Sequence, residues 1–183
     1  MNNNDEEALI EQLRIKTEDC YVSSKMCCSE SIIYALNHAL NGGLEDETAM
    51  RVGAGFCGGM GANEGCGALN GAIFVLGLLL TANEPHSRRT NKKIRSVSAE
   101  LRNKFKKRFK YEKCADLTKA QKGNHQARLC NCQNITGISA ELAARIILRH
   151  RPELASEVDT EFLAVQESAV GGLVKKIRSS LGL

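Results

Sequence analysis

The stretch GCGALNGAIFVLGLLLTA, residues 65–82, decides the fold of this chain. Its large aliphatic side chains recur every three to four residues, which is the spacing of one helical face: Leu69, Ile73, Leu76 and Leu80. The apolar part, residues 68–82, contains Asn70 and is too short to cross the roughly 30 Å hydrocarbon core of a bilayer comfortably. We therefore expect a buried central helix, capped by Asn63 and closed by Pro85.

Glycine is concentrated just before this helix, with eight glycines between Gly53 and Gly71. Because glycine is unfavourable in helix interiors, we expect a loop in the first part of this run. Residues 53–58, GAGFCG, match the dinucleotide-binding pattern G-x-G-x-x-G, but a helical segment rather than a strand precedes them. No acidic residue follows at the distance that ribose binding needs. The run therefore indicates a glycine-rich loop and argues against a nucleotide site.

Helical periodicity continues on both sides of this region. We expect helices over residues 6–21, 29–40, 45–52, 90–111 and 126–150, and one or two more after Pro152. In the first of them the expected core positions are Leu9, Ile10, Leu13 and Ile15. Strand-like alternation is scarce. The sequence thus predicts an all-α fold, a compact multi-helix bundle with a central buried helix following a Gly-rich loop.

Two segments are expected along the chain. Residues 1–152 would form a cysteine-rich helical redox domain, which ends where Pro152 stops a helix. Residues 153–183 would form a C-terminal helical extension, packed on that domain or placed at a dimer interface, because their apolar positions also follow a helical stripe.

The composition indicates in which compartment the protein works and what its cysteines do there. The chain has 183 residues, a net charge of +4 and eight cysteines. This length supports an ordinary hydrophobic core, so the cysteines are not needed as staples. Residues 1–7 are polar and acidic, unlike a secretory signal peptide, and we expect a cytoplasmic protein. In that reducing compartment a cysteine-rich pattern indicates metal binding or redox chemistry.

Cys66 is the cysteine closest to the start of the expected central helix. Free backbone N–H groups and the helix dipole favour a thiolate at such a position. Gly65 and Gly67 flank it and let the backbone approach a bound group closely. Gly67 and Gly71 also share one helical face, where another helix can pack. The alternative is that the glycines form only a packing groove and that Cys66 is a small buried side chain.

Residues 66–71, CGALNG, match a Cys-Gly-Ala-x-x-Gly motif. With its surroundings this motif resembles the redox-active family named for the pattern C-GCAxxG-C-C, over roughly residues 16–150. The likeness also covers CSES at 28–31, GFCGGMG at 55–61, CADL at 114–117, and Cys132 before a helix. The ordered set of cysteines around a glycine-rich run makes the resemblance specific.

The resemblance implies an all-helical redox protein with four family cysteines, here Cys28, Cys66, Cys114 and Cys132. A related domain occurs in split-Soret cytochromes, where an iron–sulfur cluster accompanies haem, but no Cys-x-x-Cys-His haem motif occurs here. We therefore expect these cysteines to ligate a [2Fe-2S] or [4Fe-4S] cluster for electron transfer or redox sensing. Cys57, where many relatives would have glycine, and Cys130 are the substitute ligands.

Two other chemistries stay open from the sequence. A metal-free thiol/disulfide redox protein would use the close pairs Cys27–Cys28 or Cys130–Cys132. A structural zinc-binding helical module would use four thiolates, although the paired C-x-x-C knuckles of such sites are missing. No arrangement of serine, histidine and carboxylate predicts a catalytic residue, so whether the protein is an enzyme stays open.

The stretch 88–113 is strongly basic, with twelve Lys or Arg and two acidic residues. Phe105 and Phe109 belong to its single apolar stripe, so we expect these rings inside and the basic side chains outside. Such a face is either simply solvated or a docking surface for an acidic redox partner protein. A nucleic-acid partner is not expected, because no aromatic side chains are left for base stacking.

Overall fold

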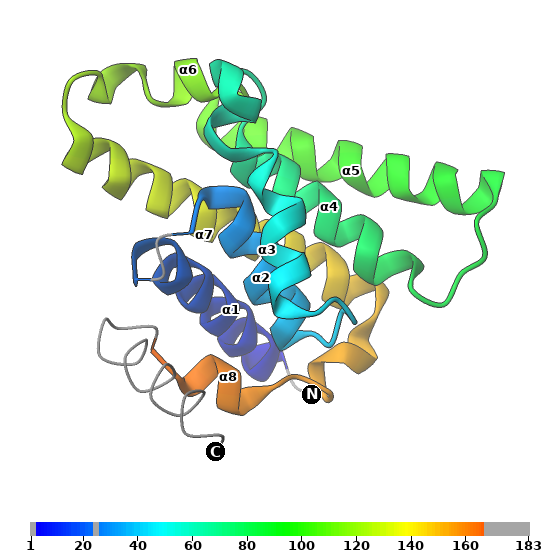
Figure 1. Ribbon diagram of the computed structural model, residues 1–183. Helices are drawn as coiled ribbons and strands as arrows, with labels where there is room; N and C mark the ends of the chain where they lie inside the picture. The colour runs from blue at the N-terminus through cyan, green and yellow to red at the C-terminus, as the bar shows by residue number, and fades with distance from the viewer. Residues whose placement is uncertain (1–2, 24–25, 167–183) are drawn as a thin grey trace.

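The computed structural model describes residues 3–23 and 26–166. Within these ranges the chain is built from α-helices (Figure 1): α1 (Asn3–Ser23), α2 (Cys28–Ala39), α3 (Asp46–Ala54), α4 (Gly67–Thr81), α5 (Arg88–Phe109), α6 (Cys114–Leu117), α7 (His125–His150) and α8 (Thr160–Ala164). Shorter turns are η1 (Gly59–Asn63), η2 (Lys119–Gln121) and η3 (Pro152–Ala155). The described residues form no strand, only one isolated antiparallel bridge between Gly65 and Lys113. The all-α prediction is confirmed.

Helices α2 and α4 lie side by side at the centre of the molecule (Figure 1). α4 contacts α5 and α7, and α2 contacts α1, α3, α7 and α8. Several of their side chains are completely buried, among them Ile32, Ile33, Leu36, Val75 and Leu76. The central buried helix is therefore confirmed, and α2 shares its place. None of the described helices combines the length and apolar character needed to span a bilayer.

The start of α4 differs from the prediction. Cys66 is the N-cap, whereas Asn63, the expected cap, has a φ of 58° and ends η1. The loop before it also contains three glycines with positive φ, which glycine adopts without steric cost: Gly58, Gly59 and Gly61. The Asn63 prediction is wrong because this left-handed backbone delays the helix.

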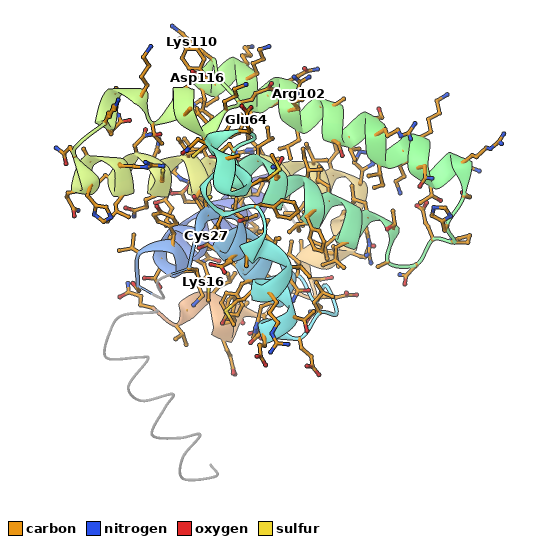
Figure 2. All side chains as sticks on the ribbon, turned by 45° about the horizontal axis from the view of Figure 1, so that its top comes forward. Lys16, Cys27, Glu64, Arg102, Lys110 and Asp116 are labelled. Carbon is orange, nitrogen blue, oxygen red and sulfur yellow. A yellow bond between two sulfur atoms is a disulfide. The ribbon has the colours of Figure 1, made fainter. Side chains whose placement is uncertain are left out.

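The glycine-rich loop is held against the segment that leads into α6. The Cys66 N–H donates to the Glu112 carbonyl at 2.8 Å, and the Cys114 N–H donates to the Glu64 carbonyl at 2.6 Å. Lys113 also forms an ion pair with Glu64. Figure 2 shows Glu64 and Asp116 of α6 at the same end of the molecule. These bonds place Cys66 and Cys114 on two neighbouring backbone segments.

Helix α1 forms where it was expected, with one difference in its buried face. Leu9, Ile10 and Leu13 are buried, but Ile15 is 54% exposed. At 3.6 residues per turn, the face that carries Leu13 continues to residues 17 and 20, and these are completely buried. The prediction for Ile15 is wrong because it lies too far around the helix.

Helix α5 confirms the expected basic helix. Ser87 caps it by accepting a hydrogen bond from the Thr90 N–H at 3.1 Å. The Phe105 ring is completely buried, and the Phe109 ring packs against it with centroids 4.7 Å apart. Arg102, labelled in Figure 2, pairs with Glu112 at the surface. The helix therefore turns its aromatic side inward.

The first part of the expected C-terminal extension packs on α2. Leu154 and Phe162 are buried, and the Asp159 N–H donates to the Ala39 carbonyl at 3.0 Å. The Phe162 ring stacks on His38, with centroids 4.0 Å apart. The later apolar positions of the extension, from residue 170 onward, lie outside the described residues.

We expect Gly71→Ala to destabilise the protein and Gly77→Ala to stabilise it, although both glycines belong to α4. A Cβ on Gly71 would lie 3.0 Å from Ser29 Cα and 3.1 Å from its carbonyl oxygen, whereas nothing lies within 4 Å of that position on Gly77. Overpacking at Gly71 should cost about 1–2 kcal/mol, and Ala at Gly77 should gain about 1 kcal/mol of helix propensity. Urea unfolding measures both; equal effects would contradict the close contact between α2 and α4.

Candidate functional site

Four cysteines reach one region from four different elements. Cys28 is the first residue of α2, Cys66 is the N-cap of α4, and Cys114 is the first residue of α6. Cys132 lies inside α7, because Asn124 caps that helix well before it. The expectation that Cys132 precedes a helix is therefore wrong. We refer to these four residues as the four-thiol site.

A cavity of about 450 Å³ adjoins these cysteines. Cys28, Cys114 and Cys132 line it. The rest of its wall consists of Tyr21, Val22, Met26, Cys27, Gly58, Arg128 and Leu129. Cys66 is buried, and its thiol is close enough to the others for its charge to raise the pKa of Cys28. The structure thus brings together all four cysteines that the resemblance singled out.

Burial makes the thiols of Cys28 and Cys66 hard to ionise. It raises the pKa of Cys28 to about 12, and the charges of Cys66, Cys132 and Cys114 add to this effect. It also raises the pKa of Cys66 to about 11. Hydrogen bonds from the backbone N–H groups of Leu69 and Ala68 lower the pKa of Cys66, as expected at a helix start, but they are weaker than burial. The expectation of a thiolate at Cys66 is therefore wrong for the metal-free protein.

The metal-free protein should lose stability at alkaline pH. The pKa of Cys28 and Cys66 is higher in the folded protein than the usual value of about 9. The unfolded chain therefore releases these protons first, and the free energy of unfolding should be constant below about pH 9 and fall as pH rises toward 12. Urea unfolding across this range measures the slope. A double variant, Cys28→Ser with Cys66→Ser, should show a smaller fall, and an equal fall would contradict the assignment.

Two polar side chains that the sequence analysis missed face Cys132. Burial raises the pKa of Cys132, while hydrogen bonds from Tyr21 and Arg128 oppose this rise. An Arg128 guanidinium nitrogen also lies 4.0 Å from the Cys114 sulfur. Arg128 precedes Cys132 by four residues, a spacing that puts both on one helical face and could have revealed it. Nothing in the sequence around Tyr21 signals its position.

Two glycines allow the thiols to approach the loop closely. A Cβ on Gly67 would lie 2.7 Å from the Cys28 sulfur and 2.7 Å from the Phe56 carbonyl oxygen. A Cβ on Gly59 would lie 2.8 Å from Cys114 Cβ. Gly65 is less crowded: a Cβ there would lie 3.2 Å from the Asn70 side chain. The Gly65 backbone forms the bridge to Lys113. Gly67 therefore supports the site by close packing, and Gly65 by pairing the two backbone segments.

Cys27 and Cys57 form a disulfide, with Cα atoms 5.8 Å apart. Neither of the close pairs considered from the sequence is joined: Cys28, Cys130 and Cys132 are free thiols. Cys57 is consequently not free to ligate a metal in this state. Cys130 is exposed, and its sulfur accepts a hydrogen bond from Gln126.

The closest group of metal-type ligands lies outside the four-thiol site. Among the described residues, three such side chains have ligand atoms all within 4.8 Å of one another in a single place: Cys27, Glu30 and Cys57. Two of these three are joined in the disulfide. This group therefore cannot offer three free ligands unless the disulfide is reduced.

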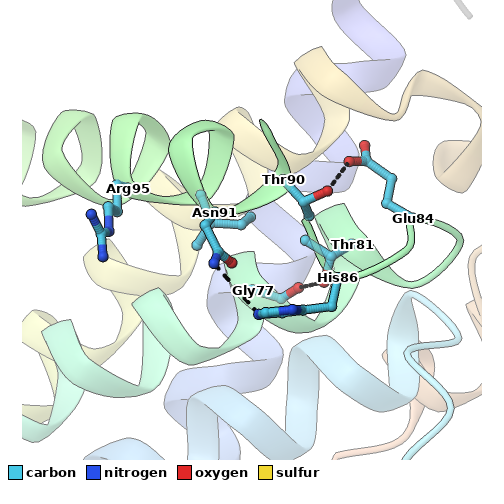
Figure 3. A pocket seen from close by; sticks show the side chains of 8 residues that line it. Gly77, Thr81, Glu84, His86, Thr90, Asn91 and Arg95 are labelled. Carbon is cyan, nitrogen blue, oxygen red and sulfur yellow. Dashed lines mark hydrogen bonds between the residues drawn. The ribbon is translucent and has the colours of Figure 1, made fainter. Parts of the chain in front are cut away.

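A second hollow lies between the end of α4 and the start of α5 (Figure 3). Its polar side chains hydrogen-bond to one another: Thr90 to Glu84 at 3.3 Å, and Asn91 to His86 at 3.4 Å. No cysteine lines it. It therefore lacks the sulfur side chains that line the cysteine-lined cavity.

Fold and site together define a class, an all-helical protein in which cysteines from separate helices converge beside a glycine-rich loop. A family model described as "Putative redox-active protein (C_GCAxxG_C_C)" matches residues 26–146, and the chain belongs to this family. The matched span contains the four-thiol site and the Cys27–Cys57 disulfide. Comparisons with curated proteins and with solved structures found no match.

Proposed function

We propose that this redox-active protein holds a [2Fe-2S] or [4Fe-4S] cluster through Cys28, Cys66, Cys114 and Cys132, and that it serves in electron transfer or redox sensing. The convergence of thiols from four elements carries the proposal: Cys28, Cys114 and Cys132 line one cavity, and Cys66 is buried next to Gly67, which packs against the Cys28 sulfur. Four cysteine thiolates are the usual ligand set of both cluster types.

The electrostatics of the site support a bound cation. Each buried thiolate raises the cost of ionising its neighbours, and iron ions would remove that cost by coordinating the sulfurs. The Ala68 and Leu69 N–H groups, the Tyr21 hydroxyl and the Arg128 guanidinium already hydrogen-bond to thiol sulfur. Such bonds stabilise a cluster and tune its reduction potential.

The spacing of the sulfurs favours a cluster over a single zinc ion. Tetrahedral zinc with Zn–S bonds of about 2.3 Å brings its sulfurs to about 3.8 Å from one another. Within the described part of the chain, no three of the four thiols lie mutually within 4.8 Å. A group with more than one metal ion suits this wider arrangement, so we place zinc second.

The substitute ligands suggested by the sequence are set aside in this proposal. Cys57 is bonded to Cys27. Cys130 precedes Cys132 by two residues in α7, so its side chain points about 200° around the helix from that of Cys132. Its exposed position fits this direction.

The proposed role is that of a cytoplasmic carrier that meets an acidic redox partner protein. The exposed basic side chains of α5 would attract such a partner, and the association would weaken with salt. The segment 153–183 would serve as a helical extension, packed on the domain or at a dimer interface, and Leu154 and Phe162 provide the first contacts of such packing.

Visible absorption after anaerobic purification tests the ligand set. Wild-type protein and a Cys130→Ser control should be brown with thiolate-to-iron bands, and Cys66→Ser should be colourless while keeping its helical circular dichroism. Retained colour in Cys66→Ser would contradict the proposal. Loss of colour in Cys130→Ser would mean that Cys130, and not Cys132, is the cluster ligand from α7.

A further inference from the structure

The Cys27–Cys57 disulfide lies at the wall of the cavity beside the four-thiol site. Cys27 lines this cavity together with Cys28, Cys114 and Cys132, and it directly precedes Cys28 in the chain. Figure 2 shows Cys27 where α2 begins, close to the loop after α3 that carries Cys57. A sulfur pair that can exchange two electrons therefore adjoins the proposed cluster site.

The two sulfurs are held together by more than their bond. The Ser29 hydroxyl donates to the Gly53 carbonyl at 2.8 Å, and its oxygen lies 3.2 Å from the Cys27 sulfur and 3.7 Å from the Cys57 sulfur. A Cβ on Gly53 would lie 2.7 Å from Glu30 Cα, so the backbones of α2 and α3 are in direct contact. The two helices would stay joined after reduction, and the thiols would remain positioned to re-form the bond.

The surroundings of the pair allow electrons and protons to reach it. Both cysteines are partly exposed. A Glu30 carboxylate oxygen accepts a hydrogen bond from the Cys27 N–H at 2.6 Å, and the carboxylate lies within 4.8 Å of both sulfurs. In a reducing cytoplasm, a disulfide that forms at all is usually catalytic or redox-sensing.

We infer that Cys27 and Cys57 form a second redox site, a thiol/disulfide couple that exchanges electrons with a cluster bound at the four-thiol site. The inference rests on the proposed function. It makes the protein a relay between a one-electron carrier protein, which reduces the cluster, and a dithiol/disulfide substrate, which takes up the electrons as a pair.

Reduction of the couple starts from the disulfide and a reduced cluster. The Cys27–Cys57 S–S bond breaks, two electrons arrive one at a time from the reduced cluster, and each sulfur takes up one proton from solvent or by way of Glu30. The oxidised cluster is reduced again by the external carrier. Return to the disulfide passes two electrons and two protons to a disulfide substrate, which becomes a dithiol.

An anaerobic reductive titration with reduced methyl viologen tests the relay. The cluster-loaded wild-type protein should take up two electrons more per chain than a Cys57→Ser variant of equal iron content. Alkylation followed by mass spectrometry should show Cys27 and Cys57 becoming thiols together. A Cys130→Ser control should match the wild type in both readouts.

Iron and sulfide analysis of the same samples separates the two claims. Wild-type protein without a cluster would end the proposed function and the relay with it. A loaded protein that takes up no extra electrons and keeps its disulfide would overturn the relay alone. A Cys66→Ser variant should keep the disulfide in viologen but lose it in dithiothreitol; reduction by viologen at the wild-type rate would show that the cluster is not the route.

Discussion

A Gly67→Ala variant is expected to lose most of the iron–sulfur cluster that we propose for the wild-type protein. The added methyl group would lie 2.7 Å from the Cys28 sulfur and 2.7 Å from the Phe56 carbonyl oxygen. The backbone oxygen cannot move without shifting the residue next to Cys57, so the Cys28 thiol must give way. We expect overpacking to cost about 1–3 kcal/mol of folding free energy as well. Iron content and urea unfolding measure the two effects.

The matched control is Gly77→Ala, about three turns further along α4, where nothing lies within 4 Å of the new methyl group. That variant should keep its cofactor and be at least as stable as the wild type. If Gly67→Ala bound iron as well as Gly77→Ala does, the close approach of Cys28 to the start of α4 would play no part in cofactor binding.

Phe105→Ala should produce the largest loss of stability, about 3–5 kcal/mol. The Phe105 ring is completely buried, and Phe109 packs against it. Its removal leaves a cavity on the inner side of α5, the helix that contacts both α4 and α7. Thermal and urea unfolding of the purified variant measure the loss.

Tyr111→Ala is the aromatic control for this prediction. Tyr111 lies just beyond the end of α5 and is 53% exposed, so its removal should change the stability by no more than about 0.5 kcal/mol. Similar losses of stability in the two variants would mean that the buried Phe105 ring does not anchor α5 to the core.

Helix periodicity was sufficient to predict the framework of the fold. The stripes that contain Leu13 and Phe105 are buried as the spacing indicates, because burial of one helical face is a local property of the sequence. Errors occurred where the backbone leaves regular geometry. Asn63 was expected to cap α4, but the chain reaches Cys66 only after a turn of left-handed residues whose shape depends on pairing with residues 112–114.

The candidate site was predictable only in part. The four thiols were identified by their resemblance to a family pattern, since their spacing along the chain matches no local metal motif. Tyr21 and the Cys27–Cys57 disulfide were not foreseen, because Tyr21 meets Cys132 through the packing of α1 against α7, and the disulfide depends on the packing of α3 against α2. Such contacts join residues far apart in sequence, and the periodicity of a single helix does not predict them.

The geometry also explains how a helical fold can bring several thiols together. Helix starts present free N–H groups and partial positive charge, and Cys28 and Cys66 occupy two such positions. Close packing through Gly67 and Gly71 brings these starts together. The residues that build the core therefore also determine where the thiols meet.

The most direct test of the cluster proposal is analysis of iron, acid-labile sulfide and zinc in wild-type protein purified without oxygen. The four-thiol site predicts iron with a matching amount of sulfide and little zinc. Zinc without sulfide would instead indicate a structural metal module, and protein free of all three would leave thiol chemistry alone; either result would contradict an iron–sulfur cluster at Cys28, Cys66, Cys114 and Cys132.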